Sequence, residues 1–247
     1  MKNALSLFAF LLLFLAFACN DEDPIQPMPE PEPEPELASL ANGQVFHAPF
    51  AGNADDVAGN LSGTVNGATA TSDRHGVANE AYEFDGFDDV IDYGEGDILV
   101  MPNQDPYTIS AWVKMEDRGD GEVNMIMAKF NKDVNAGWFL GVSSTGKLRS
   151  YRHNVPWSLN SNSSITYGEY VHVAAAYDGT ELSVYLNGQL DRSIPFGRNN
   201  NDRSTGVLVG GMYDNGNVNP LLRGVVDEIR IHNRVLTQEE LTWLAEH

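Results

Sequence analysis

Three carboxylates fall within five residues in the segment FDGFDD, residues 84–89: Asp85, Asp88 and Asp89. Clustered like charges repel one another unless a cation or hydrogen-bond donors neutralise them. Ca²⁺ takes about six to eight oxygen ligands, and carboxylates are prominent among them. The segment therefore predicts a calcium site. A solvated hairpin turn around Gly86 is the alternative.

The stretch SYRHNVPWSLNSN, residues 150–162, gathers aromatic and hydrogen-bonding side chains around one proline. Carbohydrate sites use aromatic faces against sugar C–H surfaces and polar groups against hydroxyls, within a shallow cleft. We therefore predict ligand contacts from Tyr151, Arg152, His153 and Trp157. The alternative is that Trp157 only packs a loop onto the domain.

A second group of polar and aromatic residues comes from FGRNNNDRS, residues 196–204, and GGMYDNGN, residues 210–217. Arg198, Tyr213 and Asn215 are the further ligand residues predicted there. Both segments read as loops or sheet edges, and asparagine-rich turns without a ligand are the alternative.

The amino-terminal segment explains the position of the single cysteine. Residues 4–18 are apolar and uncharged, follow Lys2 and end in Ala18, which is typical of a secretory signal peptide spanning residues 1–18. The segment LAFAC, residues 15–19, resembles a bacterial lipoprotein signal, so Cys19 is predicted to carry the lipid. An unmodified cysteine beside an ordinary cleavage site is the alternative.

Residues 19–42 are predicted to form an acidic linker rich in proline and glutamate. Residues 20–37 hold seven carboxylates, six prolines and no basic residue. The PEPEPEPE run favours an extended polyproline II stalk of about 3.1 Å per residue. The acids after Cys19 resemble the export tag of Bacteroidetes-type surface lipoproteins. We expect an exported protein, lipid-anchored to the outer membrane and facing the exterior; a linker without an address is the alternative.

Charge limits the partners of this chain. Its 15 basic and 35 acidic residues give a formal net charge of −20. Such a chain is a poor partner for nucleic acid or anionic lipid, so the membrane is expected to be reached only through the lipid anchor. The remaining residues, 43–247, are enough for one well-buried domain.

Short strands dominate that domain. TISAWVKM, residues 108–115, alternates, with Ile109, Ala111 and Val113 on one face. Turn dipeptides such as Asn187-Gly188 separate the strands. This pattern predicts an all-β fold, a two-sheet antiparallel β-sandwich or jelly roll. A capping box in LTQEELTWLAEH, residues 236–247, predicts a short C-terminal helix.

Five motifs in order resemble a known family: FHAPFAGNADDVAGNLSGTVNGAT, AYEFDGFDDVIDYG, YTISAWVKM, GEYVHVAAAYDGTELSVYLNGQL and GVVDEIRIHNRVLTQEEL. They are similar to the concanavalin A-like, laminin G-like domains of bacterial surface proteins, and the resemblance covers residues 43–247. It implies a concanavalin A-like jelly roll.

The resemblance also implies a structural Ca²⁺, held by an acidic residue of the last long strand together with oxygens from the amino-terminal part of the domain. Asp227 fits the first role. The residues that could complete the site are Asp55, Asp56, Asn60, Asp85 and Asp89.

The same superfamily includes endoglucanases with a Glu-x-Asp-x-x-Glu strand. The nearest segment here, Glu83 to Asp88, ends in aspartate and contains Gly86, which favours a turn. HExxH and GxSxG motifs are absent from the sequence. We therefore predict a protein that is not an enzyme: a lectin-like domain that binds polysaccharide at the outer membrane surface. An adhesion or scaffold domain with a protein partner is the alternative, and a hydrolase with an unrecognised site is a weaker one.

Overall fold

The computed structural model describes residues 37–95, 99–101, 105–152, 158–197 and 206–247. The chain divides into Met1–Pro35 and Glu36–His247, and all described residues belong to the second unit. The predicted signal peptide, Cys19 and most of the predicted linker lie outside the described residues. Within the described ranges, no helix has the length and apolar character needed to cross a membrane.

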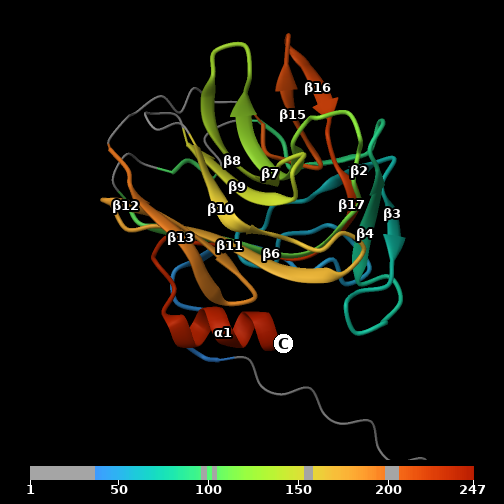
Figure 1. The fold of residues 1–247 in the computed structure, drawn as a ribbon. Coiled ribbons are helices and arrows are strands. Elements are labelled where there is room, and N and C mark those ends of the chain that lie inside the picture. Colours follow the sequence, from blue (N-terminus) through green and yellow to red (C-terminus); the bar gives the residue numbers. More distant parts are fainter. Residues whose placement is uncertain (1–36, 96–98, 102–104, 153–157, 198–205) are drawn as a thin grey trace, which may run out of the picture. The chain divides into compact units, whose positions relative to one another are not determined.

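In its described residues, the domain consists of two stacked sheets and one helix (Figure 1). The first sheet, sheet A, has the strand order β13-β12-β11-β6-β17-β4-β3, and β1 also pairs with β17. All of its pairings are antiparallel. Its strands are β1 (Gln44–Ala48), β3 (Thr69–Thr71), β4 (Ala81–Asp85), β6 (Tyr107–Met115), β11 (Tyr170–Tyr177), β12 (Glu181–Leu186), β13 (Gln189–Pro195) and β17 (Arg223–His232).

The second sheet, sheet B, has the order β10-β9-β8-β7-β14-β5-β2. A hairpin, β15 with β16, joins it through a single parallel pairing of Tyr213 with Asn131. Its strands are β2 (Thr64–Asn66), β5 (Val90–Asp92), β7 (Asn124–Asn131), β8 (Ala136–Val142), β9 (Lys147–Arg152), β10 (Ser158–Ser164), β14 (Leu208–Val209), β15 (Gly211–Asp214) and β16 (Asn217–Pro220).

The main core fills the space between the sheets. On β6, the alternating residues Ile109, Ala111 and Val113 are at most 2% exposed and face it, as their spacing predicts. Trp138 and Leu140 of β8 approach from the other sheet. Each fully buried large apolar side chain contributes about 1.5–3 kcal/mol, so the pattern of alternation fixes which face each strand turns inward. The predicted antiparallel sandwich is confirmed.

The C-terminal helix α1 (Gln238–Glu246) packs on the outer face of sheet A, opposite to sheet B (Figure 1). Leu241 and Leu244 are buried there against Ala174 of β11. The predicted capping box is present. The Glu240 backbone N–H donates to the Thr237 hydroxyl at 3.2 Å, and the Thr237 N–H donates to the Glu240 carboxylate at 2.8 Å.

The Asn187-Gly188 turn between β12 and β13 packs directly against this helix. Both residues have positive φ, 46° and 72°, which suits the tight hairpin that the sequence predicts. A Cβ on Gly188 would lie 2.8 Å from the Leu241 carbonyl oxygen. Glycine is therefore needed both for the turn and for the close approach of α1.

Candidate functional site

Sheet B carries a groove on its outer face, away from the main core. Residues of β7, β8, β9 and β15 alternate between the two faces, and those that turn outward form a separate apolar cluster. The groove over this cluster has a volume of about 490 Å³. Its lining residues are Val123, Met125, Phe130, Lys132, Asn135, Phe139, Arg149, Tyr151, Ser158 and Met212.

Three aromatic rings form the floor of the groove. Phe139 and Tyr151 face each other across β8 and β9 and are stacked, with ring centroids 5.0 Å apart and an interplanar angle of 6°. Phe130 of β7 meets both rings edge-on, at 5.4 and 4.9 Å. Each ring is only 5–6% exposed. The rings thus make a rigid apolar floor, of which a small part is open to a ligand.

The rim of the groove is polar. The guanidinium of Arg149 lies 5.9 Å from the centroid of the Phe139 ring. Lys132 is ion-paired with Asp214 at 2.9 Å. The Tyr151 hydroxyl donates to the Asn135 side chain at 2.9 Å. Burial raises the pKa of Tyr151, although the charge of Arg149 works against this, so the hydroxyl remains a donor at neutral pH.

Of the ligand residues predicted from the sequence, Tyr151 lines the groove. Arg152 is the next residue on β9 and therefore turns to the opposite face. There its guanidinium lies 5.2 Å from the ring centroids of both Tyr107 and Tyr177 and donates to the Met101 carbonyl at 2.7 Å. Arg152 thus lies inside the sandwich and does not line the groove.

The remaining predicted ligand residues fall elsewhere. His153, Trp157 and Arg198 lie outside the described residues. The Tyr213 ring packs against Gly206, where an added Cβ would be 2.5 Å from the tyrosine hydroxyl. Asn215 is at the tip of the β15–β16 hairpin, and its N–H donates to Asp133 at 2.7 Å.

Sequence reasoning did not identify Phe130, Phe139 and Arg149 as members of the site. One signal for them exists. The β7 segment NMIMAKFN carries apolar residues on both faces, which is typical of a strand covered on both sides. On the outer face of sheet B this covering is incomplete, and the groove lies there.

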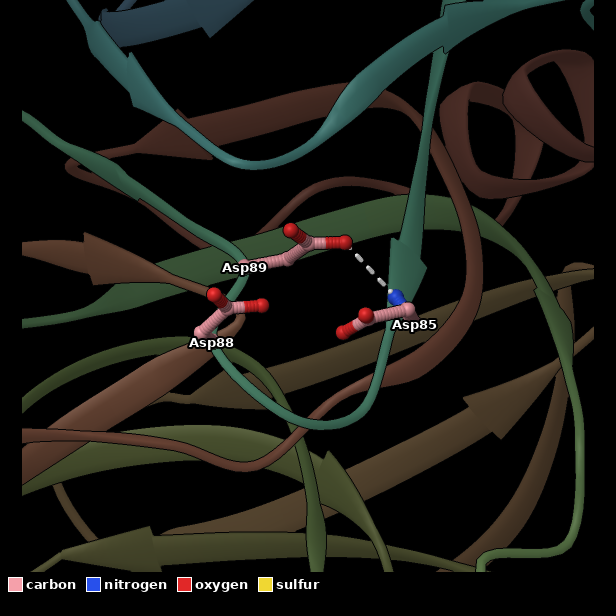
Figure 2. Close-up of side chains that lie close together, drawn as sticks. All are labelled: Asp85, Asp88 and Asp89. Carbon is pink, nitrogen blue, oxygen red and sulfur yellow. Dashed lines mark hydrogen bonds between the residues drawn. The ribbon is translucent and has the colours of Figure 1, made fainter.

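The acidic hairpin between β4 and β5 brings together Asp85, Asp88 and Asp89 (Figure 2). One carboxylate oxygen of each lies within 4.8 Å of the others, and no other group of this kind occurs in the described parts of the chain. The Asp85 N–H donates to Asp89 at 2.8 Å. Burial, with the charges of its two neighbours, raises the pKa of Asp89. Such a group can accept a hard cation.

Two of the other predicted calcium ligands, Asp56 and Asp227, have partners of their own. Asp56 is 3% exposed and accepts the backbone N–H groups of His47, Ala58 and Gly59 at 2.8–2.9 Å. Asn60 is exposed in the same loop, with φ of 62°. Asp227 on β17 pairs with Arg74 at 2.6 Å. The structure therefore brings Asp85 and Asp89 together and leaves Asp227 in an ion pair.

The Asp227 carboxylate belongs to a buried charged cluster under α1. Its side chain is 1% exposed, and burial raises its pKa to about 7 although Arg74 lowers it. The β17 bulge places Glu228, with φ of 52°, beside it. Burial alone would raise the pKa of Glu228, but His47 at 2.8 Å and the charge of Arg230 outweigh it and lower the pKa to about 2.

A second hollow, of about 560 Å³, opens beside the ends of β1, β6 and β17. Its lining is mainly apolar, with Leu61, Leu99 and Met101 among the lining residues. The buried titratable groups of its lining are His232, whose imidazole contacts the Leu40 carbonyl at 2.8 Å, and Tyr107. The groove on sheet B is the hollow that combines aromatic rings with cationic and amide side chains.

The two stacked antiparallel sheets are consistent with the class of concanavalin A-like folds. Residues 85–242, more than half of the chain, match the family described as the concanavalin A-like lectin/glucanases superfamily, and the chain belongs to this superfamily. No curated protein matches the chain.

Solved structures share the fold at low sequence identity. Domain 4 of AbnA, a GH43 extracellular arabinanase from Geobacillus stearothermophilus, in complex with arabinotriose, has a TM-score of 0.62 and 20% identity, covering 82% of this chain and 98% of that one. The botulinum neurotoxin serotype D ligand binding domain, in complex with N-acetylneuraminic acid, has a TM-score of 0.63 and 15% identity, covering 85% of this chain and 52% of that one. The chain therefore spans about half the length of the toxin domain.

Proposed function

We propose that the domain binds a carbohydrate chain in the groove on sheet B, without cleaving it. The observation that carries the proposal is the pairing of a rigid aromatic floor with a rim of Arg149, Lys132, Asn135 and Ser158. Sugars combine apolar C–H faces with hydroxyl groups, so they suit a surface of this composition. Two proteins with the same fold, named above, were solved with arabinotriose and with N-acetylneuraminic acid.

The proposal extends to where the domain acts. A lipid on Cys19 and an extended linker over residues 19–42 would hold the sandwich away from an outer membrane and present its groove to polysaccharide outside the cell. A structural Ca²⁺ at the acidic hairpin is part of the proposal. The sequence-based alternatives, a protein-binding adhesion domain and a hydrolase, are the competing outcomes of the test.

The test is a polysaccharide array probed with the full chain in mild detergent, scoring both binding and product release. Ser158 lines the groove and pairs with Tyr151 in register, so Ser158→Tyr should block it. Ser163→Tyr, on the exposed end of the same strand, is the matched control. We expect saturable binding without cleavage, lost in Ser158→Tyr and kept in Ser163→Tyr. Binding that survives Ser158→Tyr would place the site elsewhere, and released product would reveal an enzyme.

A further inference from the structure

Arg149 differs from the other groove residues in its contacts. It lies in the middle of β9, between Gly141 on β8 and Asn160 on β10. Its guanidinium lies over the Phe139 ring, 5.9 Å from the ring centroid. The Nε atom of Arg149 is buried and has no hydrogen-bond partner among the described residues. A buried N–H group without an acceptor is costly, so the guanidinium is held over the ring without the hydrogen bond that this atom could make.

The charge of Arg149 is also unmatched. Five of the eight arginines in the described residues have carboxylate partners. Among them, Arg74, Arg118 and Arg234 pair with acids at 2.6–2.7 Å. In the described part of the chain, no carboxylate forms such a pair with Arg149. Lys132, the other cation of the groove, is already paired with Asp214.

The groove lining also differs in charge from the chain as a whole. The chain has 35 acidic residues against 15 basic ones, yet the described residues that line the groove include two cations and no carboxylate. Because the rest of the domain is strongly acidic, a groove lining without carboxylates beside an unpaired guanidinium favours a negatively charged ligand there.

The shape of the guanidinium indicates which kind of anionic group it binds. Its planar fork matches a carboxylate through two parallel N–H···O bonds. We infer that the groove takes a glycan with carboxylate-bearing sugars, and that Arg149 binds the carboxylate while the aromatic floor contacts the sugar ring. This inference rests on the proposed function, because it names the class of glycan for the same groove.

The first experiment compares ligands and needs no variant. Oligogalacturonate is titrated into the full chain by calorimetry, beside the same oligomer with its carboxyl groups reduced to alcohols, and beside dextran and dextran sulfate. We expect binding of oligogalacturonate and loss of at least about tenfold in affinity on reduction. Equal binding of the acidic and reduced oligomers overturns the inference. Dextran sulfate binding as tightly as oligogalacturonate overturns the choice of carboxylate.

The second experiment assigns the effect to Arg149. Arg149→Gln should weaken oligogalacturonate binding about 10-fold to 100-fold and leave binding of the reduced oligomer unchanged. Arg149→Lys keeps the charge and should recover only part of the affinity, because it lacks the fork. Arg192→Gln is the matched control. Arg192 is an exposed arginine of β13 that donates to the Asn160 carbonyl of β10, and the variant should bind oligogalacturonate as the wild type does. An unchanged affinity in a folded Arg149→Gln variant overturns the assignment.

The outcomes for this inference and for the proposed function are distinct. If neutral glycans bind, Ser158→Tyr abolishes their binding and Arg149→Gln has no effect, the groove is a carbohydrate site but not an acidic-sugar site. If no glycan binds to the folded chain, both statements fail. Thermal unfolding of each variant checks that it is folded, and the comparison of acidic with reduced oligomer remains decisive if Arg149→Gln does not fold.

Discussion

The Asp227 carboxylate should make the domain less stable as the pH rises, and replacing it with asparagine should remove that effect. Burial raises its pKa to about 7 from the ordinary value of 3.8. Between these values the folded chain keeps a proton that the unfolded chain has released. The free energy of unfolding therefore falls as pH rises through this window. A pKa difference of about 3 corresponds to about 4 kcal/mol at about 1.4 kcal/mol for each pH unit.

The measurement is urea unfolding of the wild type and of Asp227→Asn from pH 4 to pH 8. Burial also lowers the pKa of His172 to about 3 and that of His232 to about 4. Both histidines make the folded state more stable as pH rises towards 6.5, so the total pH profile mixes opposing effects. They titrate in both proteins, and the difference between the two free energies isolates the carboxylate. We expect the free energy of unfolding of Asp227→Asn, relative to that of the wild type, to rise by about 4 kcal/mol from pH 4 to pH 8.

Glu240→Gln is the control, because the pKa of Glu240 is shifted in the direction opposite to that of Asp227. The Arg234 guanidinium lowers the pKa of Glu240 to about 2, so its contribution is present above pH 4.5 and is lost only as the pH falls towards 2. The difference in free energy of unfolding between Glu240→Gln and the wild type should therefore be constant from pH 5 to pH 8. The reasoning about Asp227 is refuted if Asp227→Asn loses stability relative to the wild type as pH rises, because Arg74 would then hold the carboxylate ionised throughout.

Three further predictions concern the helix, the turn beneath it and the acidic hairpin. Thr237→Ala removes the helix cap and should lower the free energy of unfolding by about 1 kcal/mol, measured with urea; an unchanged midpoint would contradict the capping box. Gly188→Ala should destabilise by more than about 1 kcal/mol because of its positive φ and the nearby Leu241 carbonyl, and a rise in Tm would show that the turn can adapt. Millimolar Ca²⁺ should raise the Tm of the wild type and have a smaller effect on Asp88→Asn; a Tm independent of both Ca²⁺ and chelator would mean that the hairpin holds no metal.

The two neighbouring residues Tyr151 and Arg152 show how far the sequence reaches into the site. Read as part of a loop, they look like partners for one ligand. The structure places them on β9, where adjacent side chains turn to opposite faces, so Tyr151 joins the groove and Arg152 enters the sandwich. The aromatic floor could not be read from one segment, because its rings come from three strands whose register only the folded sheet fixes.

By itself the sequence determined the features that depend on near neighbours: the alternating strands, the glycine turns and the capping box of α1. These follow from local sterics and from burial of one face of each strand, so the antiparallel sandwich and its C-terminal helix could be predicted. Only the tertiary structure decided which distant groups meet. It pairs Asp227 with Arg74, 153 positions away, and leaves Arg149 without an acid over the rings of the groove. Charge and hydrogen bonding act through space, so their partners are set by the packing of strands far apart in the chain.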